Sequence, residues 1–525
     1  MRRPRPLALV LIALLLLVVA GAIAVRLLLG GDHIKAAIEA QASAALGRPV
    51  TIRSAVPRFF PRVSLDLDDV TVGETREITI DRVRLSTGLR ALFGRRVEDA
   101  QVSVGGSRID VRWALALLRV LTTPSATPTP TASSPYALTI VSITSISLRD
   151  VTLVAGPHSL RVEMDSSMIG SDRFVVRRLQ ARSEIDTGAK QTSAESSPSS
   201  EFTASGEVDS LTKGTGKFAI DAASLDLDAL MAFLTAATPS GSQAVPEATS
   251  APAPPPPPSY RVDIDVRAKR GRALGIALGN LASNCHVAGD RVTLDGLQLD
   301  LFGGRFAGSA AYSGSPAPRY EWRGQFDNLD VPQVVAFAGA SGSITGRLGG
   351  ALSLAAAGAD PTTAIERARG SARVAITDGQ IPGLQIVRSV ILAFGRPTGE
   401  VPAGSGESFT RIAATLDVNG PALSTQDLSF ASRDFDMTGE GRLSLATQDV
   451  DFHTNVILSQ ELSAQAGRDL YRLAREGDRI VLPARITGTV SSPTVFIDMQ
   501  SALQRALRNR AEDEIRKLFD RFRKK

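Results

Sequence analysis

The sequence predicts a mainly β protein with a few helices. It consists of an N-terminal transmembrane helix, a long, repetitive antiparallel β-array in the form of an open groove or an elongated sandwich, and a C-terminal amphipathic helix. Three features predict this: a charge-free apolar run near the N-terminus, alternation of apolar and polar residues over most of the chain, and a basic amphipathic stripe at the end. An aromatic fraction of 5% with 45 Gly and 29 Pro also favours many short strands over long helices.

The net charge of +5 is concentrated at the two ends of the chain. Arg2, Arg3 and Arg5 lie at the N-terminus, and nine basic residues accompany four acidic ones from Arg505 to Lys525, which leaves about −3 for the body. A body of that charge has no general attraction for polyphosphate. Nucleic acid is therefore excluded as a partner, and the basic ends favour membrane surfaces.

Residues 7–29 are predicted to cross a membrane, after a basic cytoplasmic N-terminus at 1–6. Nineteen residues without a charged or strongly polar side chain form a helix of roughly 28 Å, and the arginines before it place the body on the export side. The alternative is a cleaved signal peptide with small residues near its end, but the run exceeds the usual apolar region of about 7–15 residues. The anchor residues are Leu7, Leu11, Leu15, Val19 and Val25.

The body divides by composition into an N-terminal β-rich region (30–237), a proline-rich linker (238–259) and a C-terminal β-rich region (260–500). A Pro/Thr/Ser-rich insertion at 122–135 interrupts the first region. A helix over Asp32–Leu46 opens the body and ends at Gly47-Arg48-Pro49, after which apolar residues recur every second position.

One phrase recurs along the body: apolar-x-apolar, a turn-like Asp or Gly, then apolar-x-apolar again. It predicts hairpin after hairpin, hence a long antiparallel meander or stacked array. The phrase occurs in LDLDDVTVG (65–73), ISLRDVTLVAG (146–156), VTLDGLQLDLFGG (292–304), VAITDGQIPG (374–383) and ATLDVNGPAL (414–423).

Three helices are predicted in the second half. Val331–Phe337 has Asp330 as N-cap and Pro332 in its first turn, and Ser459–Arg475 has one apolar face. The third covers 501–525, with apolar positions flanked by basic ones. It either caps the last strand edge or lies on an anionic membrane, and one helix can do both.

The sequence contains no pattern typical of catalysis, so we expect no enzyme, no catalytic residue, no cofactor and no metal site. The four histidines have no ligand at metal-binding spacing, and the side chains of Cys285 and His286 are expected on opposite faces of a strand. The FGGRFAG segment lacks the lysine of a phosphate loop and is interpreted as a hairpin turn. Asp68-Asp69 is interpreted as a strand-end pair.

Alternation gives every strand one apolar face, and this face is the candidate site. In a closed sandwich such faces cover each other, whereas in an array that curls without closing they line a trough that suits acyl chains. The residues alone do not decide between the closed sandwich and the open trough. The candidate lining residues are Val63, Leu65, Leu67, Leu294, Leu299, Leu301, Leu443 and Leu445.

The chain resembles the AsmA family. The resemblance lies in IEAQASAALGRPVTI (38–52) and FFPRVSLDLDDVTVG (59–73), and more strongly in GSARVAITDGQIPGLQI (370–386), residues 409–445 and LPARITGTVSSPTVFIDM (482–499). These motifs are structural and transfer no catalytic residue.

The resemblance implies a bacterial inner-membrane protein whose periplasmic body is related to bridge-like lipid-transfer proteins. Its expected partners are the inner membrane and a phospholipid or other membrane lipid, and its expected role is in outer-membrane biogenesis. The alternative function is a non-enzymatic assembly factor with a closed β-core, which acts through an outer-membrane or periplasmic protein partner on protein targeting or lipopolysaccharide content.

Overall fold

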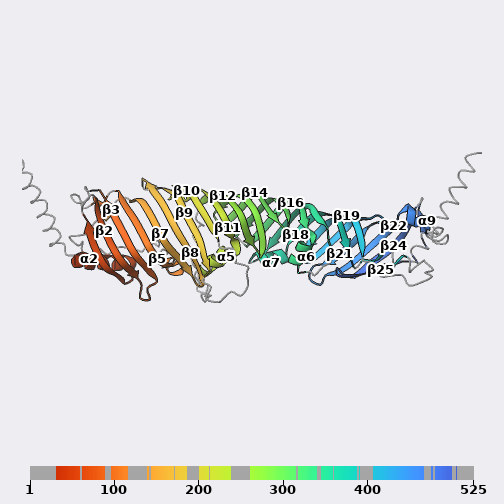
Figure 1. Cartoon of the computed structure of the whole chain (residues 1–525), viewed down its shortest axis with the longest axis horizontal. Helices are drawn as coiled ribbons and strands as arrows, with labels where there is room; N and C mark the ends of the chain where they lie inside the picture. Colours follow the sequence, from red (N-terminus) through yellow and green to blue (C-terminus); the bar gives the residue numbers. More distant parts are fainter. Residues whose placement is uncertain are drawn as a thin grey trace, which may run out of the picture. The chain divides into compact units, whose positions relative to one another are not determined.

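The protein is mainly β, and the strands of each of its two compact units form a long antiparallel sheet that is open (Figure 1). The computed structural model describes residues 31–58, 62–88, 96–97, 99–115, 139–140, 143–170, 172–185, 200–211, 213–237, 260–314, 317–339, 344–358, 360–382, 384–386, 389–390, 406–465, 474–476, 479–498, 500 and 504. Unit 1 comprises 1–264 with 271–274, and unit 2 comprises 265–270 with 275–525.

The strands of unit 1 pair in chain order. They are β1 (Val50–Arg58), β2 (Val63–Val72), β3 (Ile78–Thr87), β5 (Ala100–Asp110), β7 (Ile143–Ala155), β8 (His158–Ile169), β9 (Arg173–Ile185), β10 (Glu201–Ser210) and β11 (Thr215–Asp226). The predicted meander is wrong at one step, because β5 and β7 are parallel. The long connection that contains the 122–135 insertion allows this, since parallel neighbours need a crossover of about a dozen residues or more. The short strands β4 (Arg96–Val97) and β6 (Thr139–Ile140) pair separately.

The strands of unit 2 form an antiparallel meander. They are β13 (Ile276–Ala288), β14 (Arg291–Leu301), β15 (Gly304–Ser313), β16 (Arg319–Asp330), β17 (Arg347–Ala357), β18 (Arg369–Ile381), β19 (Glu407–Asn419), β20 (Ala422–Ala431), β21 (Phe435–Ser444), β22 (Asp449–Leu458), β24 (Arg479–Thr489) and β25 (Ser492–Ile497). β12 (Arg261–Ala273) has residues in both units, and β23 (Arg475–Glu476) pairs briefly with β24.

The turn-like residue of the recurring phrase lies inside a strand in four of the five phrases, so that part of the hairpin prediction is wrong. Asp69, Asp150, Gly296 and Asp378 have φ values of 49°, 54°, 59° and 53° within β2, β7, β14 and β18. Only Asp and Gly, with Asn, adopt this left-handed conformation readily. In the fifth phrase Gly420 does form a turn, between β19 and β20.

Two of these residues, Asp150 and Gly296, lie in β-bulges that shift the alternation by one position. At Asp69 and Asp378 the pairing with the neighbouring strands keeps its register. In β14, Leu294 pairs with Ala310 and Leu297 pairs with Gly308, so two residues of β14 face one residue of β15. The same shift occurs in β7 at Asp150. Apolar residues on both sides of the bulge therefore reach the same face, which a regular strand with this sequence would not allow.

The helix predicted over Asp32–Leu46 is confirmed as α2 (Gly31–Leu46). Gly47, with φ 63°, ends it, and the Arg48 N–H donates to the Ser43 carbonyl at 3.2 Å. Side chains of α2 satisfy the free edge of β1: the Val50 N–H donates to Ser43 Oγ at 2.9 Å, and the Ile52 N–H donates to Glu39 Oε1 at 2.6 Å.

The other helices are short. α6 (Val331–Phe337) is confirmed with its predicted bounds, although the Asp330 side chain makes no cap hydrogen bond. α9 (Gln460–Gln465) covers only the start of the predicted Ser459–Arg475 helix, because residues 466–473 lie outside the described part and Arg475 belongs to β23. α5 (Leu227–Ala237) and α7 (Pro361–Glu366) are the remaining helices with defined bounds.

The anchor residues Leu7, Leu11, Leu15, Val19 and Val25 lie outside the described residues, as do the linker 238–259 and all of the predicted 501–525 helix except Gln504. No helix in the described part is both long enough and apolar enough to cross a membrane.

Candidate functional site

The candidate site is the apolar face of β14–β18, on which side chains form rows across neighbouring strands. The rows follow from the antiparallel register, because directly paired residues lie on the same face of a sheet. From the start of β14, the rows are Val292–Tyr312–Tyr320, Leu294–Ala310–Trp322–Leu354, Leu297–Gly308–Gly324–Leu352 and Leu299–Phe306–Phe326–Gly350–Val374. We call the surface that these residues form the apolar face.

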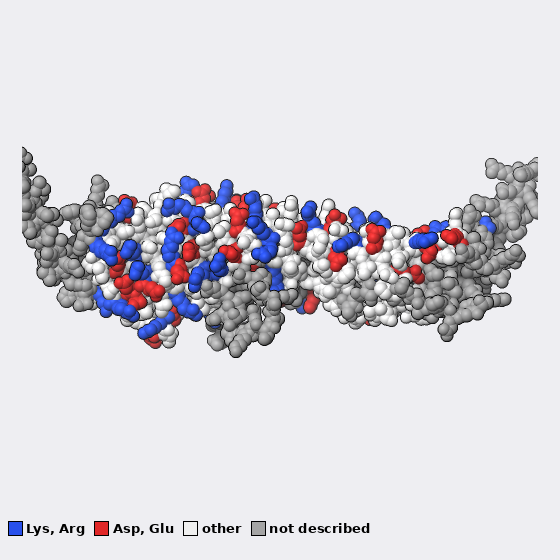
Figure 2. Space-filling view, in the orientation of Figure 1, with Lys and Arg blue, Asp and Glu red and all other residues white. Residues whose placement is uncertain are grey.

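The opposite face of the same strands is polar. Its rows include Gln298–Ala307–Gln325 and Asp300–Arg305–Asp327. Ion pairs tie neighbouring residues together, as between Arg305 Nε and Asp300 Oδ1 at 3.5 Å. Figure 2 shows Lys and Arg interspersed with Asp and Glu on the side of the molecule that it displays. The charged and polar side chains make this face hydrophilic, in contrast to the apolar face.

The apolar face of β14–β18 is only partly covered. The Leu, Val and Tyr side chains in its rows, with Phe306 and Trp322, are half-buried, whereas Phe326 is buried. A local cluster of Ala356, Ala364 and Ala368 packs against Tyr320 and Trp322. Among the described residues, these apolar side chains therefore keep part of their surface accessible, as is typical of a binding surface.

Farther along unit 2 the same face is filled. Leu384, Ile386 and Val390, from the connection between β18 and β19, pack with Phe435 and Leu482 in one buried cluster. Phe430 and Phe435 stack with centroids 5.1 Å apart, and both are fully buried or nearly so. The apolar face thus ends at a conventional hydrophobic core.

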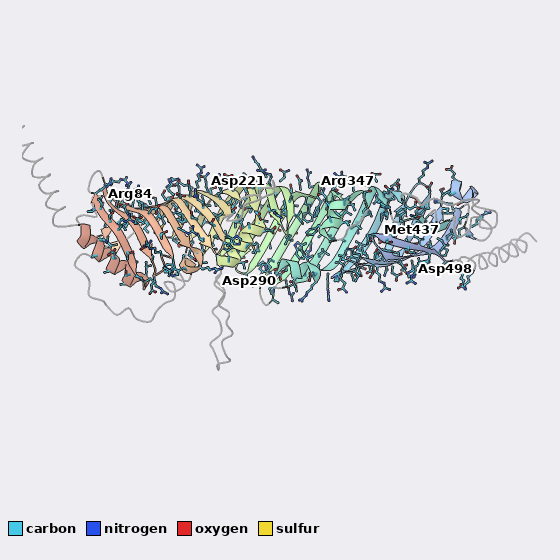
Figure 3. All side chains as sticks on the ribbon, turned by 60° about the horizontal axis from the view of Figure 1, so that its bottom comes forward. Arg84, Asp221, Asp290, Arg347, Met437 and Asp498 are labelled. Carbon is cyan, nitrogen blue, oxygen red and sulfur yellow. The ribbon has the colours of Figure 1, made fainter. Side chains whose placement is uncertain are left out.

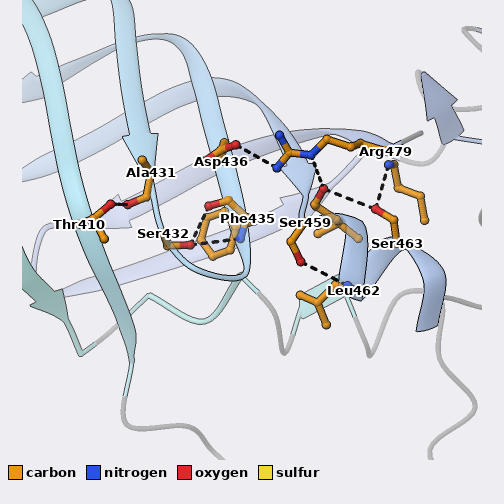
Figure 4. Close-up of polar contacts among 11 residues, drawn as sticks. Thr410, Ala431, Ser432, Phe435, Asp436, Ser459, Leu462, Ser463 and Arg479 are labelled. Carbon is orange, nitrogen blue, oxygen red and sulfur yellow. Dashed lines mark hydrogen bonds and ion pairs between the residues drawn. The ribbon is translucent and has the colours of Figure 1, made fainter. Parts of the chain in front are cut away.

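Hydrogen bonds fix this core at its edge (Figure 4). Ser432 Oγ donates to the Phe435 carbonyl at 2.6 Å and holds the turn between β20 and β21. Arg479 Nη2 donates to Asp436 Oδ2 at 2.9 Å, and buried Ser463 accepts from the Ile480 N–H at 3.2 Å. These contacts satisfy the Phe435 carbonyl and the Ile480 N–H at the edge of the core.

The predicted lining residues of unit 1 lie under a helix. Leu67 is buried in a cluster with Val50, Ile52 and Val70, and Leu65 packs against it together with Ile38 of α2. Val63 is half-buried at the start of β2. This part of the sheet is a closed local core, so it does not extend the open surface.

The predicted residues of unit 2 separate into two groups. Leu294, Leu299 and Leu301 lie together on β14, half-buried, on the apolar face. Leu443 pairs with Leu423 and Val450, farther along the unit. Leu445 follows the end of β21 and is 43% exposed, so it is not part of a strand face.

Sequence reasoning missed the aromatic residues of the apolar face. Tyr312 and Tyr320 have ring centroids 5.1 Å apart, and Tyr320 stacks on Trp322 at 5.8 Å with an interplanar angle of 7°. Their signal was present: Tyr320, Trp322 and Phe326 occupy even-numbered positions of RYEWRGQF and therefore share one face of β16.

The polar face of unit 1 carries a buried carboxylate. Asp66 accepts from Arg84 Nε at 2.7 Å and lies 3.1 Å from Arg58 Nε. The hydrogen bond from Arg84 holds the pKa of Asp66 below its usual value, against the opposing effect of burial. Asp68 and Asp69 pair with Arg82 and Arg53 from inside β2, so the prediction that they end a strand is wrong.

The other residues considered for catalysis, phosphate binding or metal binding form no such site among the described residues. Cys285 is buried and exposed His286 lies on the other face, as predicted, and burial raises the pKa of the Cys285 thiol. Phe302 and Gly303 of FGGRFAG form the predicted turn, with φ values of 47° and 71°. Within the described ranges, no three His, Cys, Asp or Glu side chains gather closely enough to hold a metal ion.

No protein-family model matches this chain, and no curated protein or solved structure is significantly similar to it. Membership of the AsmA family therefore remains a prediction from the quoted motifs.

Proposed function

We propose that the protein binds the acyl chains of membrane lipids on the apolar face of β14–β18. The observation that supports this most is a multi-strand apolar surface, backed by a polar face, that the described residues leave partly exposed. Each CH₂ group that leaves water contributes about 0.8 kcal/mol, so ten buried methylenes contribute about 8 kcal/mol before the cost of ordering the chain. Binding by partition needs no catalytic residue.

The proposal includes a cellular setting that rests on sequence alone. We propose an inner-membrane protein anchored by 7–29, with a periplasmic body that holds or transfers lipid in support of outer-membrane biogenesis. The supporting features are the charge-free run, the arginines before it and the resemblance to the AsmA family. The alternative, an assembly factor that acts through protein contacts, requires no lipid on the apolar face, and the experiment below separates the two.

Replacing Leu294 and Leu299 together with Asp is expected to reduce by about tenfold the lipid that the full chain binds beyond the lipid around its membrane helix, because two carboxylates then face the acyl chains. Lipid content is measured by extraction and mass spectrometry after purification in mild detergent. The matched control is Thr293→Asp with Gln298→Asp, on the opposite face of the same strand.

Both double variants retain the predicted membrane helix, so lipid that surrounds this helix is common to both and cancels in the comparison. The control is expected to keep the lipid content of the unsubstituted protein, with both variants folded by circular dichroism. Equal lipid content in all three proteins would contradict the proposal. Unfolding of only the leucine variant would indicate a closed core and favour the assembly factor.

A further inference from the structure

The apolar face has two chemically different edges, formed by the two ends of its strands. We call one the tyrosine edge, where Arg291, Ser313 and Arg319 lie in register, and the other the phenylalanine edge, which carries Phe302 and Phe337. In Figure 3, Asp290 marks the first and Arg347 marks the second, at opposite margins of the sheet.

The tyrosine edge carries amphipathic rings. Tyr312, Tyr320 and Trp322 form a continuous cluster in the two rows nearest this edge. Each ring combines an apolar body with a hydroxyl or indole N–H that can hydrogen-bond. Such residues are preferred where an apolar phase meets a polar one, as at the surfaces of a lipid bilayer.

The ring pair at the phenylalanine edge has no hydroxyl or N–H group that could donate a hydrogen bond. Phe302 and Phe337 lie 5.7 Å apart, and Phe337 is 50% exposed. Its cations are engaged in ion pairs, because Arg347 Nη1 lies 3.6 Å from Asp330 and Arg305 Nε lies 3.5 Å from Asp300. The rings of this edge therefore offer a ligand apolar contact and no hydrogen bond, although Gln333 and Arg347 lie close to Gly303.

Cations at the tyrosine edge are available by comparison. Arg291 and Arg319 pair with the same residue, Ser313, so their strands lie on either side of β15, about 10 Å apart. Both are exposed, and neither forms an ion pair with any described residue. They alternate with Val292 and Tyr320, so they extend from the polar face at the rim of the sheet. Acidic neighbours are present in Asp290 and Asp360, but Asp360 caps α7 through Thr363. Arginine is well suited to phosphate oxygens.

From these contrasts we infer that a phospholipid on the apolar face lies with its headgroup at the tyrosine edge and its acyl chains directed toward the phenylalanine edge. This inference rests on the proposed function and adds the orientation of the ligand and its class, a phosphate-bearing amphiphile. Tyr312, Tyr320 and Trp322 contact the glycerol and ester region, and the rows from Leu297 to Phe326 contact the chains. Arg291 and Arg319, at the ends of their strands, supply positive charge beside the headgroup from the rim of the polar face.

Tryptophan quenching tests the orientation directly, because the chain has two tryptophans, Trp113 and Trp322. Trp113→Phe leaves Trp322 as the reporter at the tyrosine edge. A second protein with Trp113→Phe, Trp322→Phe and Phe337→Trp places the reporter at the phenylalanine edge. Each full-length protein is mixed with detergent micelles that contain phosphatidylcholine labelled with a nitroxide either on the choline or near the end of an acyl chain.

The headgroup label is expected to quench Trp322 about threefold more strongly than the chain label, and the order is expected to reverse for the tryptophan at 337, as for reporters at different depths in a bilayer. Equal quenching at both positions, or stronger quenching of Trp322 by the chain label, would overturn the orientation while leaving lipid binding intact. Absence of quenching by either label at either position would overturn lipid binding and the orientation with it. Adding Leu297→Asp to each protein is expected to abolish quenching, which distinguishes bound lipid from random collision.

Discussion

Deletion of Gly296 is expected to unfold the sheet of unit 2 or to destabilise it by about 4–6 kcal/mol. Without the extra residue, the second half of β14 reverses its faces. Leu297, Leu299 and Leu301 then point toward the polar side, while Gln298 and Asp300 point toward the apolar face. Chemical denaturation followed by circular dichroism measures the loss in the free energy of unfolding.

The matched control is Gly296→Asn, which keeps the residue count. Asn tolerates the φ of 59° at this position, and a Cβ placed here meets only Asn284 Nδ2 at 3.9 Å. We expect this substitution to cost less than about 1 kcal/mol. If the deletion and the substitution cost the same, the bulge does not set which residues of β14 face the apolar side.

Phe435→Ala is expected to cost about 3–5 kcal/mol of unfolding free energy, as is usual for a phenylalanine removed from a closed core. Phe435 is completely buried and stacks on Phe430. The ring centroids of Phe430 and Phe409 are 5.6 Å apart. Removing this ring leaves a cavity that the surrounding β-strands cannot fill. Denaturant titration of the purified variant measures the cost.

Phe306→Ala serves as the comparison on the half-exposed part of the face. Phe306 pairs with Leu299 and Phe326 but is only half-buried, so we expect a loss of about 1–2 kcal/mol. Comparable losses at positions 306 and 435 would mean that β14–β18 enclose a core as tight as the one at the far end of unit 2, and that no face is left for a ligand.

Local signals in the sequence predicted most of the elements correctly. α2 and α6 follow from their caps and breakers, and the strands follow from alternation. The bulges at Asp150 and Gly296 were mistaken for turns because Asp and Gly favour the left-handed conformation in both settings. Only the pairing with a neighbouring strand distinguishes them, and pairing is a property of the whole sheet.

The sequence predicted the type of candidate site, an apolar sheet face, but only some of the residues that form it. Alternation selected Leu294 and Leu299, but a strict period of two would place them on opposite faces, and only the bulge at Gly296 brings both to the apolar face. It also selected Leu67, which α2 covers, because no local pattern states which helix packs on which strand. The Tyr312–Tyr320–Trp322 cluster depends on the register of β15 with β16, which the separate segments do not specify.

The most direct test of lipid binding on the apolar face is a photo-crosslinking scan along β14 in the full-length protein. A benzophenone amino acid is placed at each position from Val292 to Leu301 in turn, and lipid adducts are identified by mass spectrometry after illumination. We predict adducts at 292, 294, 297, 299 and 301 and none at 293, 295, 298 and 300, so that the alternation shifts by one residue at Gly296. Adducts without alternation, or none at any position, would contradict the account.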